Sequence, residues 1–146
     1  MARRRRRSHC PCGNSSPYAQ CCAPLHRFET TADTPETLVR ARYSAFVRQH
    51  IDFIVGTTDP EGEAWQEDET TWRKEIARFS RRMTFVGLSI RTSNVEETQG
   101  TVDFVVGLRH QGEDASFREQ SHFRRHGDRW LYRRGTPQPA SWPPST

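Results

Sequence analysis

The spacing of apolar residues in the first half of the chain predicts helices. Apolar side chains recur every three or four positions over residues 35–50, which places them along one face of a helix. A short apolar run over residues 51–55 predicts a second helix, and a periodic segment over residues 70–82 predicts a third. Asp33 or Thr34 can cap the first helix, because both side chains accept hydrogen bonds from free backbone N–H groups.

Beyond Met83 the apolar period changes to two, which is typical of β-strands. This alternation predicts four strands, over residues 84–92, 101–110, 116–125 and 129–134. The short connections between them contain Gly, Asp or Asn and suit antiparallel hairpins. Helices followed by a meander predict an α+β domain, with the helices packed on one face of a curved antiparallel sheet.

The positive charge of the chain is concentrated at its start. The 146 residues suit one domain and carry a formal net charge of +4. Five arginines precede residue 8, so the rest of the chain carries a formal charge of −1. One interpretation of this segment is a solvated leader, and the other is electrostatic binding to RNA, the ribosome or an acidic protein. The residues concerned are Arg3, Arg4, Arg5, Arg6 and Arg7.

The sequence has no apolar segment of the length that a secretory signal or a membrane span needs. A signal peptide carries roughly 7–15 apolar residues behind its charged start, and polar residues and cysteines follow Arg7 instead. A membrane helix needs about 18 apolar residues in a row. We therefore expect a cytoplasmic protein, in a compartment that keeps thiols reduced.

All four cysteines lie within residues 10–22, as the pairs Cys10 with Cys12 and Cys21 with Cys22. A reducing compartment favours metal over disulfides, although two disulfides that cross between the pairs are an alternative. Tetrahedral Zn²⁺ binds four thiolates at about 2.3 Å, and two pairs joined by a short turn can supply them. Iron is the second expectation, because it also accepts thiolate ligands. Four protein ligands leave no open position, which is typical of a structural site.

Three ring-bearing residues lie near the cysteines in the sequence. His9 and His26 flank the cluster and can replace a thiolate, but we interpret both as solvated loop histidines. Tyr18 precedes the second cysteine pair, where its ring can pack over a small metal site.

The third predicted strand carries polar residues on its apolar face. Alternation places Glu119 and Ser121 on the same face as two phenylalanines, so both point toward the core. Because a buried carboxylate needs a partner, we expect Arg42 of the first helix to pair with Glu119, and Ser121 or Tyr43 to complete the hydrogen bonds. The pair is either a structural link between helix and sheet or part of a ligand pocket in which Glu119 is an acid or base. An arginine partner keeps the carboxylate ionised, which favours the structural interpretation.

The cysteine segment resembles the SEC-C metal-binding motif. The spacing C-x-C-x8-C-C, together with Pro11, Gly13 and Tyr18, matches that motif. Residues 14–16 read Asn-Ser-Ser, where the motif usually has serine, glycine and a basic residue. The resemblance implies a bound zinc or iron ion and contacts with an export chaperone or the ribosome.

Nearly the whole chain resembles the YchJ-like family, in which a SEC-C motif is followed by an NTF2-like domain. The matching segments are L-V-R-A-R-Y-S-A-F at 38–46, T-x-x-P at 57–60, F-x-E-x-S-x-F at 117–123 and G-D-R-W-L-Y-x-x-G at 127–135. The resemblance implies that the helices and the curved sheet form an NTF2-like cone.

This organisation divides the chain into four expected segments. They are a basic disordered leader at 1–9, a SEC-C zinc knuckle at 10–30, an NTF2-like domain at 31–136 and an extended Pro-rich tail at 137–146. We expect the knuckle to project toward a protein or ribosomal partner, as in an adaptor for protein export or nascent-chain handling. The alternative is an NTF2-like small-molecule binder or enzyme with a pocket around Glu119. The sequence favours binding over catalysis and leaves a homodimer through the sheet open.

Overall fold

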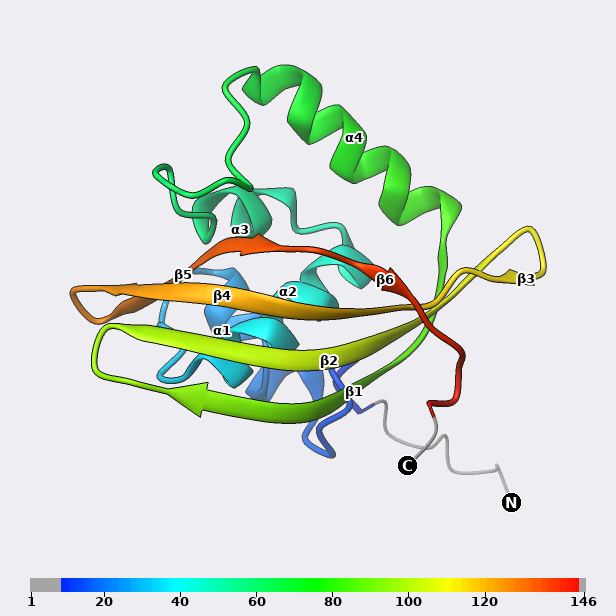
Figure 1. Cartoon of the computed structure of the whole chain (residues 1–146), viewed down its shortest axis with the longest axis horizontal. Helices are drawn as coiled ribbons and strands as arrows, with labels where there is room; N and C mark the ends of the chain where they lie inside the picture. The colour runs from blue at the N-terminus through cyan, green and yellow to red at the C-terminus, as the bar shows by residue number, and fades with distance from the viewer. Residues whose placement is uncertain (1–8, 145–146) are drawn as a thin grey trace.

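The computed structural model of the chain describes residues 9–144 (Figure 1). The arginine leader therefore lies outside the described residues. Five helical segments precede the sheet in the described part of the chain: η1 (Tyr18–Gln20), α1 (Ala23–His26), α2 (Pro35–Arg48), α3 (Ile51–Gly56) and α4 (Glu69–Arg82). The three helices predicted from periodicity are confirmed as α2, α3 and α4.

Local sequence signals set the ends of the two long helices. Thr34, rather than Asp33, caps α2, and its Oγ1 accepts a hydrogen bond from the backbone N–H of Thr37 at 3.1 Å. Asp68 caps α4 in the same way through the N–H of Thr71. Each cap satisfies a backbone donor that has no partner inside the helix.

The second half of the chain forms an antiparallel sheet. Its strands are β1 (Thr84–Val95), β2 (Gln99–His110), β3 (Glu113–Asp114), β4 (Phe117–His126), β5 (Arg129–Gly135) and β6 (Gln138–Pro139). The main order is β1-β2-β4-β5, while β3 pairs with β2 and β6 pairs with β4. The four predicted strands are confirmed as the long ones, and bulges in β1 and between β4 and β5 bend the sheet.

The helices cover one face of the curved sheet, which we call the inner face (Figure 1). The apolar core lies between this face and α2, α3 and α4. Burial of each large apolar side chain contributes roughly 1.5–3 kcal/mol. Core residues include Leu38 and Val39 of α2, Phe53 and Ile54 of α3, Trp72 and Ile76 of α4, and Val102, Phe104, Leu108 and Phe123 of the sheet.

The segment after α3 joins the sheet edge. Thr58 bridges Tyr132 of β5 in parallel, with backbone hydrogen bonds from Tyr132 to Thr57 and from Asp59 to Tyr132. This pairing brings the end of α3 and residues 57–59 beside the C-terminal half of the sheet.

The C-terminal tail packs across the outer face of the sheet. Gly87 of β1 and Gly107 of β2 are direct partners, and the indole of Trp142 lies against both. A Cβ atom on either glycine would collide with that ring. The tail is thus fixed by a specific contact as well as being extended. Within residues 9–144, no helix has the length and hydropathy that crossing a bilayer requires.

Candidate metal centre and interior cavity

The fold gathers the four cysteine sulfurs at one point. Cys10 donates its backbone N–H to Ser16 O at 2.8 Å, and Gly13, at a φ of 99°, donates to Cys10 O at 3.1 Å, so the first pair sits in a tight turn. The short helices η1 and α1 place the second pair opposite. All four Sγ atoms lie within 4.8 Å of one another, with Cys12 and Cys21 at 3.6 Å.

These distances fit a tetrahedral metal ion. Four sulfurs at about 2.3 Å from a common centre lie roughly 3.8 Å apart. Hydrogen bonding from Cys22 lowers the pKa of Cys12 to about 5, while the same contact and burial raise the pKa of Cys22. Burial raises the pKa of Cys21 to about 11. The contact between Cys12 and Cys22 therefore keeps its proton on Cys22, and a bound cation would favour the thiolate form that ligates metal. The cluster suits metal binding, and the cysteines are free rather than paired as disulfides.

The cysteine cluster packs against α2. Cys10, Cys12 and Cys22 are buried, and Cys21 is half-buried. Arg40 of α2 donates from Nη1 to Cys12 O at 2.8 Å, and Cys22 Sγ lies 3.9 Å from Arg40 O. We expected the knuckle to project from the domain. That expectation is wrong, because three of the four ligands form part of the core.

The prediction that His26 is solvated is wrong. The His26 side chain is only 6% exposed, and its Nε2–H donates to Ala41 O at 2.8 Å. Because Nε2 carries the proton, Nδ1 accepts from the hydroxyl of Tyr18 at 2.6 Å, and the Tyr18 oxygen in turn lies 3.0 Å from His50 Nε2. Burial lowers the pKa of His26 to about 4, so the ring stays neutral and ties the cysteine segment to α2.

The other two residues singled out near the cysteines are His9, expected to be solvated, and Tyr18, expected to pack its ring over the metal site. His9 is exposed, as predicted. Tyr18 packs toward His26 and beneath the guanidinium of Arg48, which lies 3.8 Å above its ring.

The predicted ion pair between Arg42 and Glu119 is also wrong. Arg42 donates from Nη1 to Ile54 O at 2.9 Å, Thr57 Oγ1 at 2.8 Å and Thr58 Oγ1 at 3.2 Å. These acceptors lie at the end of α3, which the pairing of residues 57–59 with β5 brings beside α2. Periodicity within α2 cannot reveal them, because they come from a different element.

Glu119 has other partners. Its Oε2 accepts from Ser121 Oγ at 2.5 Å and from the hydroxyl of Tyr132 at 2.9 Å. Tyr132 also links the two charges, since the guanidinium of Arg42 lies 4.5 Å from its ring centre. Ser121 thus donates to Glu119 without completing the expected pair, and Tyr43 packs edge-on against Phe85.

These polar groups border a cavity of about 220 Å³ inside the cone. Its lining is otherwise apolar and comes from α2, α4 and the inner face of the sheet. The lining residues are Val39, Arg42, Tyr43, Phe46, Phe79, Phe85, Phe104, Val106, Phe117, Glu119, Ser121, Phe123 and Tyr132. The residues predicted around Glu119 are thus brought together, although with different bonds.

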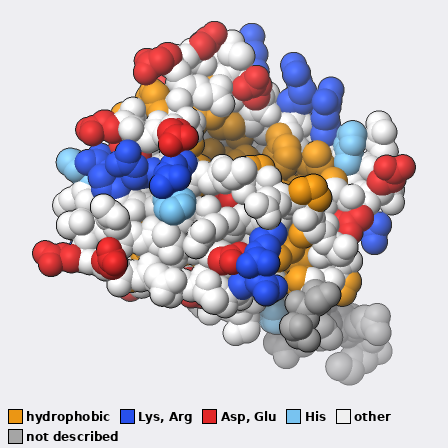
Figure 2. Space-filling model, viewed as in Figure 1, with side chains coloured by type: hydrophobic (Ala, Val, Ile, Leu, Met, Phe, Trp, Pro, Cys, Tyr) orange, Lys and Arg blue, Asp and Glu red, His pale blue; other side chains and the backbone are white. Residues whose placement is uncertain are grey.

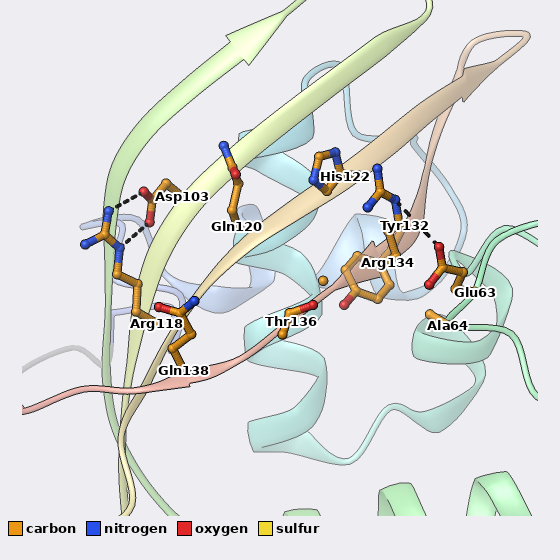
Figure 3. Close-up of a pocket in the computed structure, with 11 residues that line it drawn as sticks. Glu63, Ala64, Asp103, Arg118, Gln120, His122, Tyr132, Arg134, Thr136 and Gln138 are labelled. Atoms are coloured by element: carbon orange, nitrogen blue, oxygen red, sulfur yellow. Dashed lines mark hydrogen bonds and ion pairs between the residues drawn. The ribbon is translucent and has the colours of Figure 1, made fainter.

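A larger hollow of about 620 Å³ lies on the outer face of the sheet (Figure 3). Its charges are already paired: Arg118 donates to both carboxylate oxygens of Asp103 at 2.9 and 2.6 Å, and Arg134 lies 4.0 Å from Glu63. An open surface whose charges neutralise each other offers a ligand little, so the smaller cavity is the stronger candidate site.

One buried carboxylate was not predicted from the sequence. Asp59 is fully buried and accepts hydrogen bonds from Arg124 at 2.8 and 3.0 Å and from the N–H of Glu61 at 2.9 Å. Burial opposes its ionisation, but these hydrogen bonds outweigh it and lower the pKa of Asp59. The interaction fixes residues 59–61 on the sheet edge. No local pattern signals it, because Asp59 and Arg124 lie far apart in the sequence.

Comparison with known proteins settles the family. The model of the YchJ middle, NTF2-like domain matches residues 34–135. The chain belongs to the YchJ family. A UPF0225 protein from Serratia proteamaculans is 33% identical over 135 residues, covering 89% of this chain and 84% of the relative. A UPF0225 protein from Geobacter sulfurreducens is 33% identical over 134 residues, covering 90% and 82%.

Solved structures of SEC-C proteins share the architecture of this YchJ-family chain. A SEC-C motif containing protein from Rhodopseudomonas palustris superposes with a TM-score of 0.79 at 31% identity, covering 90% of this chain and all of that one. A second, from Psychrobacter arcticus, gives a TM-score of 0.73 at 23% identity, covering 91% and 84%, and supports the fold alone. The expected α+β architecture of a SEC-C motif and an NTF2-like domain is confirmed.

Proposed function

We propose that this protein is a cytoplasmic, zinc-binding accessory protein that contacts a protein or ribosomal partner. Its role would be that of an adaptor in protein export or nascent-chain handling, and its main activity is binding rather than catalysis. The observation that carries the proposal is the gathering of four cysteine sulfurs within 4.8 Å of one another.

The metal would fix the first described residues onto the cone. Zinc held by Cys10, Cys12, Cys21 and Cys22 stabilises a segment that has few apolar residues of its own. Iron is the second candidate for the same site. Because three ligands are buried against α2, the ion would set the position of the exposed turn at residues 13–16. That turn and the half-buried Cys21 form the surface offered to a partner.

The arginine leader would supply long-range attraction to that partner. Arg3, Arg4, Arg5, Arg6 and Arg7 precede the metal site directly in the sequence. Clustered positive charge attracts acidic surfaces, including RNA, and is screened by salt. On this proposal the chain divides as expected, into a leader (1–9), a knuckle (10–30), an NTF2-like domain (31–136) and a tail (137–146).

Metal analysis and partner capture together test this proposal. Protein purified without added metal is expected to contain one zinc per chain, and Cys21→Ser is expected to lose it. The same variant should lose co-sedimentation with ribosomes or pull-down of a protein partner, while Ser89→Ala on β1 should behave as wild type. Replacing the five leader arginines with glutamine should weaken capture most at low salt. Unchanged capture by metal-free Cys21→Ser would refute the adaptor role.

A second function is favoured by one observation, the open cavity inside the cone. The space of about 220 Å³ beside Arg42 and Glu119 is suited to a small molecule. Homodimerisation through the sheet stays a prediction, which sedimentation of the full chain can test.

A further inference from the structure

We propose that the interior cavity binds a small, neutral, heteroaromatic molecule with a cyclic amide edge. The amide carbonyl would accept from Arg42, and the amide N–H would donate to Glu119. This inference rests on the second proposed function, binding of a small molecule in the cone, and specifies the chemical class of that molecule.

The walls of the cavity favour a flat aromatic body. Six phenylalanines line it, and hydrophobic side chains gather in the hollow below α4 in Figure 2. Aromatic side chains pack well against flat rings in offset or edge-on geometry. At about 220 Å³ the cavity is smaller than the roughly 300–1,000 Å³ of a drug-sized site, which limits the ligand to one or two rings. The phenylalanines are Phe46, Phe79, Phe85, Phe104, Phe117 and Phe123.

Arg42 offers donors that the protein itself does not use. All three of its hydrogen bonds leave from Nη1, and among residues 9–144 its other N–H groups have no acceptor. The three acceptors and the ring of Tyr132 hold the guanidinium in one orientation. Burial lowers the pKa of Arg42 to about 10, so it stays charged at neutral pH. The result is a fixed donor edge at the polar end of the cavity.

Glu119 offers the complementary acceptor. Both of its hydrogen bonds end on Oε2, and Oε1 has no donor within the part of the chain that the structure describes. Tyr132 places the two groups at the same end of the cavity, because its ring lies under Arg42 and its hydroxyl binds Glu119. Arg42, with unused donors, and Glu119, with an unused acceptor, therefore both line the cavity and both contact Tyr132.

The charge balance selects a neutral ligand. Arg42 and Glu119 together contribute no net charge to the cavity. An anion would satisfy Arg42 but add an uncompensated charge beside Glu119. A zwitterion would match both groups, but two more charges would have to leave water for an apolar space. A cyclic amide places a donor and an acceptor on adjacent atoms of a flat ring and needs far less desolvation.

Titration of the metal-loaded full chain with four probes tests this assignment. The probes are 2-quinolone, 3-methyl-2-quinolone, N-methyl-2-quinolone and naphthalene, with binding measured by calorimetry and by amide shifts in β4. We expect 2-quinolone and its 3-methyl form to bind, and the N-methyl form to bind at least ten times more weakly, because it lacks the donor to Glu119. Naphthalene lacks both the carbonyl and the N–H and should bind more weakly still, and benzoate and free phenylalanine should not compete.

Substitutions at and beside Glu119 isolate the contact from the ligand N–H to that residue. Glu119→Gln should weaken 2-quinolone about tenfold and leave N-methyl-2-quinolone unchanged. Ser121→Ala, which keeps both charges, should have a smaller effect in the same direction. Asp103→Asn on the outer face is the matched control and should bind every probe as wild type does. Thermal melting of each variant confirms that the fold is retained.

The outcomes distinguish the ligand class from the site itself. If naphthalene binds as tightly as 2-quinolone, the cavity is an apolar site and the cyclic-amide class is wrong, while small-molecule binding stands. Tighter binding of benzoate or phenylalanine than of 2-quinolone would show that the ligand is charged. The neutral class would then be wrong, while small-molecule binding stands. If no probe binds, both the class and the second proposed function fall.

Discussion

The cysteine segment and the cone are ordered by different means. The cone buries large apolar side chains between the inner face of the sheet and three helices. The segment at residues 10–30 adds only a few side chains to this core, and it relies in addition on four converging sulfurs and on hydrogen bonds from Arg40 and His26. The first mechanism needs only the chain, whereas the second is complete only with an ion. Substitutions in the core of the cone should therefore destabilise the whole molecule, whereas substitutions in the cysteine segment should disturb only that segment.

The largest effect is expected from the cone. Leu38→Ala removes a fully buried side chain of α2 and should lower the free energy of unfolding by about 2–5 kcal/mol, because it leaves a cavity in the core. Urea denaturation followed by tryptophan fluorescence measures the change. Val86→Ala on β1 is the control, since Val86 is exposed and should change little. Equal effects of the two substitutions would contradict the placement of the core.

The next effect concerns the junction between residues 59–61 and the sheet. Asp59→Asn should lower the free energy of unfolding by about 1–3 kcal/mol, because the hydrogen bonds from Arg124 lose their charged acceptor. The pKa of Asp59 is lowered from 3.8 in the folded state. Its contribution is therefore complete above that value and is lost as the pH falls through the lowered pKa.

Denaturation across acid pH compares wild type with Asp59→Asn. The difference between the two should shrink as the pH falls below 3.8. Asp103→Asn is the matched control, because its pair with Arg118 is exposed to solvent on the arginine side. A difference that stays constant down to the lowest pH would exclude a role for the Asp59 charge.

An effect of similar size, but confined to the cysteine segment, is expected from the link between that segment and α2. His26→Ala removes the bonds to Ala41 and Tyr18 and should cost about 1–3 kcal/mol in the stability of that segment. Chelators should extract the metal faster, while amide protection in β2 and β4 should not change. His126→Ala, at an exposed histidine, is the control. Equal loss of protection in the sheet would show that the two regions are not separable.

The smallest effect is expected from the tail. Trp142→Ala should lower the free energy of unfolding by about 1 kcal/mol, because the indole that packs on Gly87 and Gly107 is only half-buried. Gly107→Ala should displace the same ring. Thermal unfolding of both variants and of the double variant forms a cycle, and the two effects should not add. Additive losses would show that Trp142 and Gly107 act independently.

The sequence predicted what depends on local pattern. The period of apolar residues located α2, α3, α4 and the four long strands, and the spacing of Cys10, Cys12, Cys21 and Cys22 indicated their convergence. Alternation along β4 placed Glu119 and Ser121 on the inner face.

The partners of buried polar groups were beyond such reasoning. Arg42 turns toward the end of α3 rather than toward Glu119, because residues 57–59 pair with β5. His26 is buried through contacts with α2, and Asp59 through contacts with β4. Each of these contacts joins segments that are distant in sequence, and neither propensity nor periodicity determines which polar groups meet.

X-ray absorption at the metal edge of protein purified without added metal shows which atoms surround the ion. We expect one ion per chain with four sulfur neighbours, at about 2.3 Å for zinc. Oxygen or nitrogen neighbours in place of sulfur, or metal-free protein with cross-linked cysteines, would contradict this expectation.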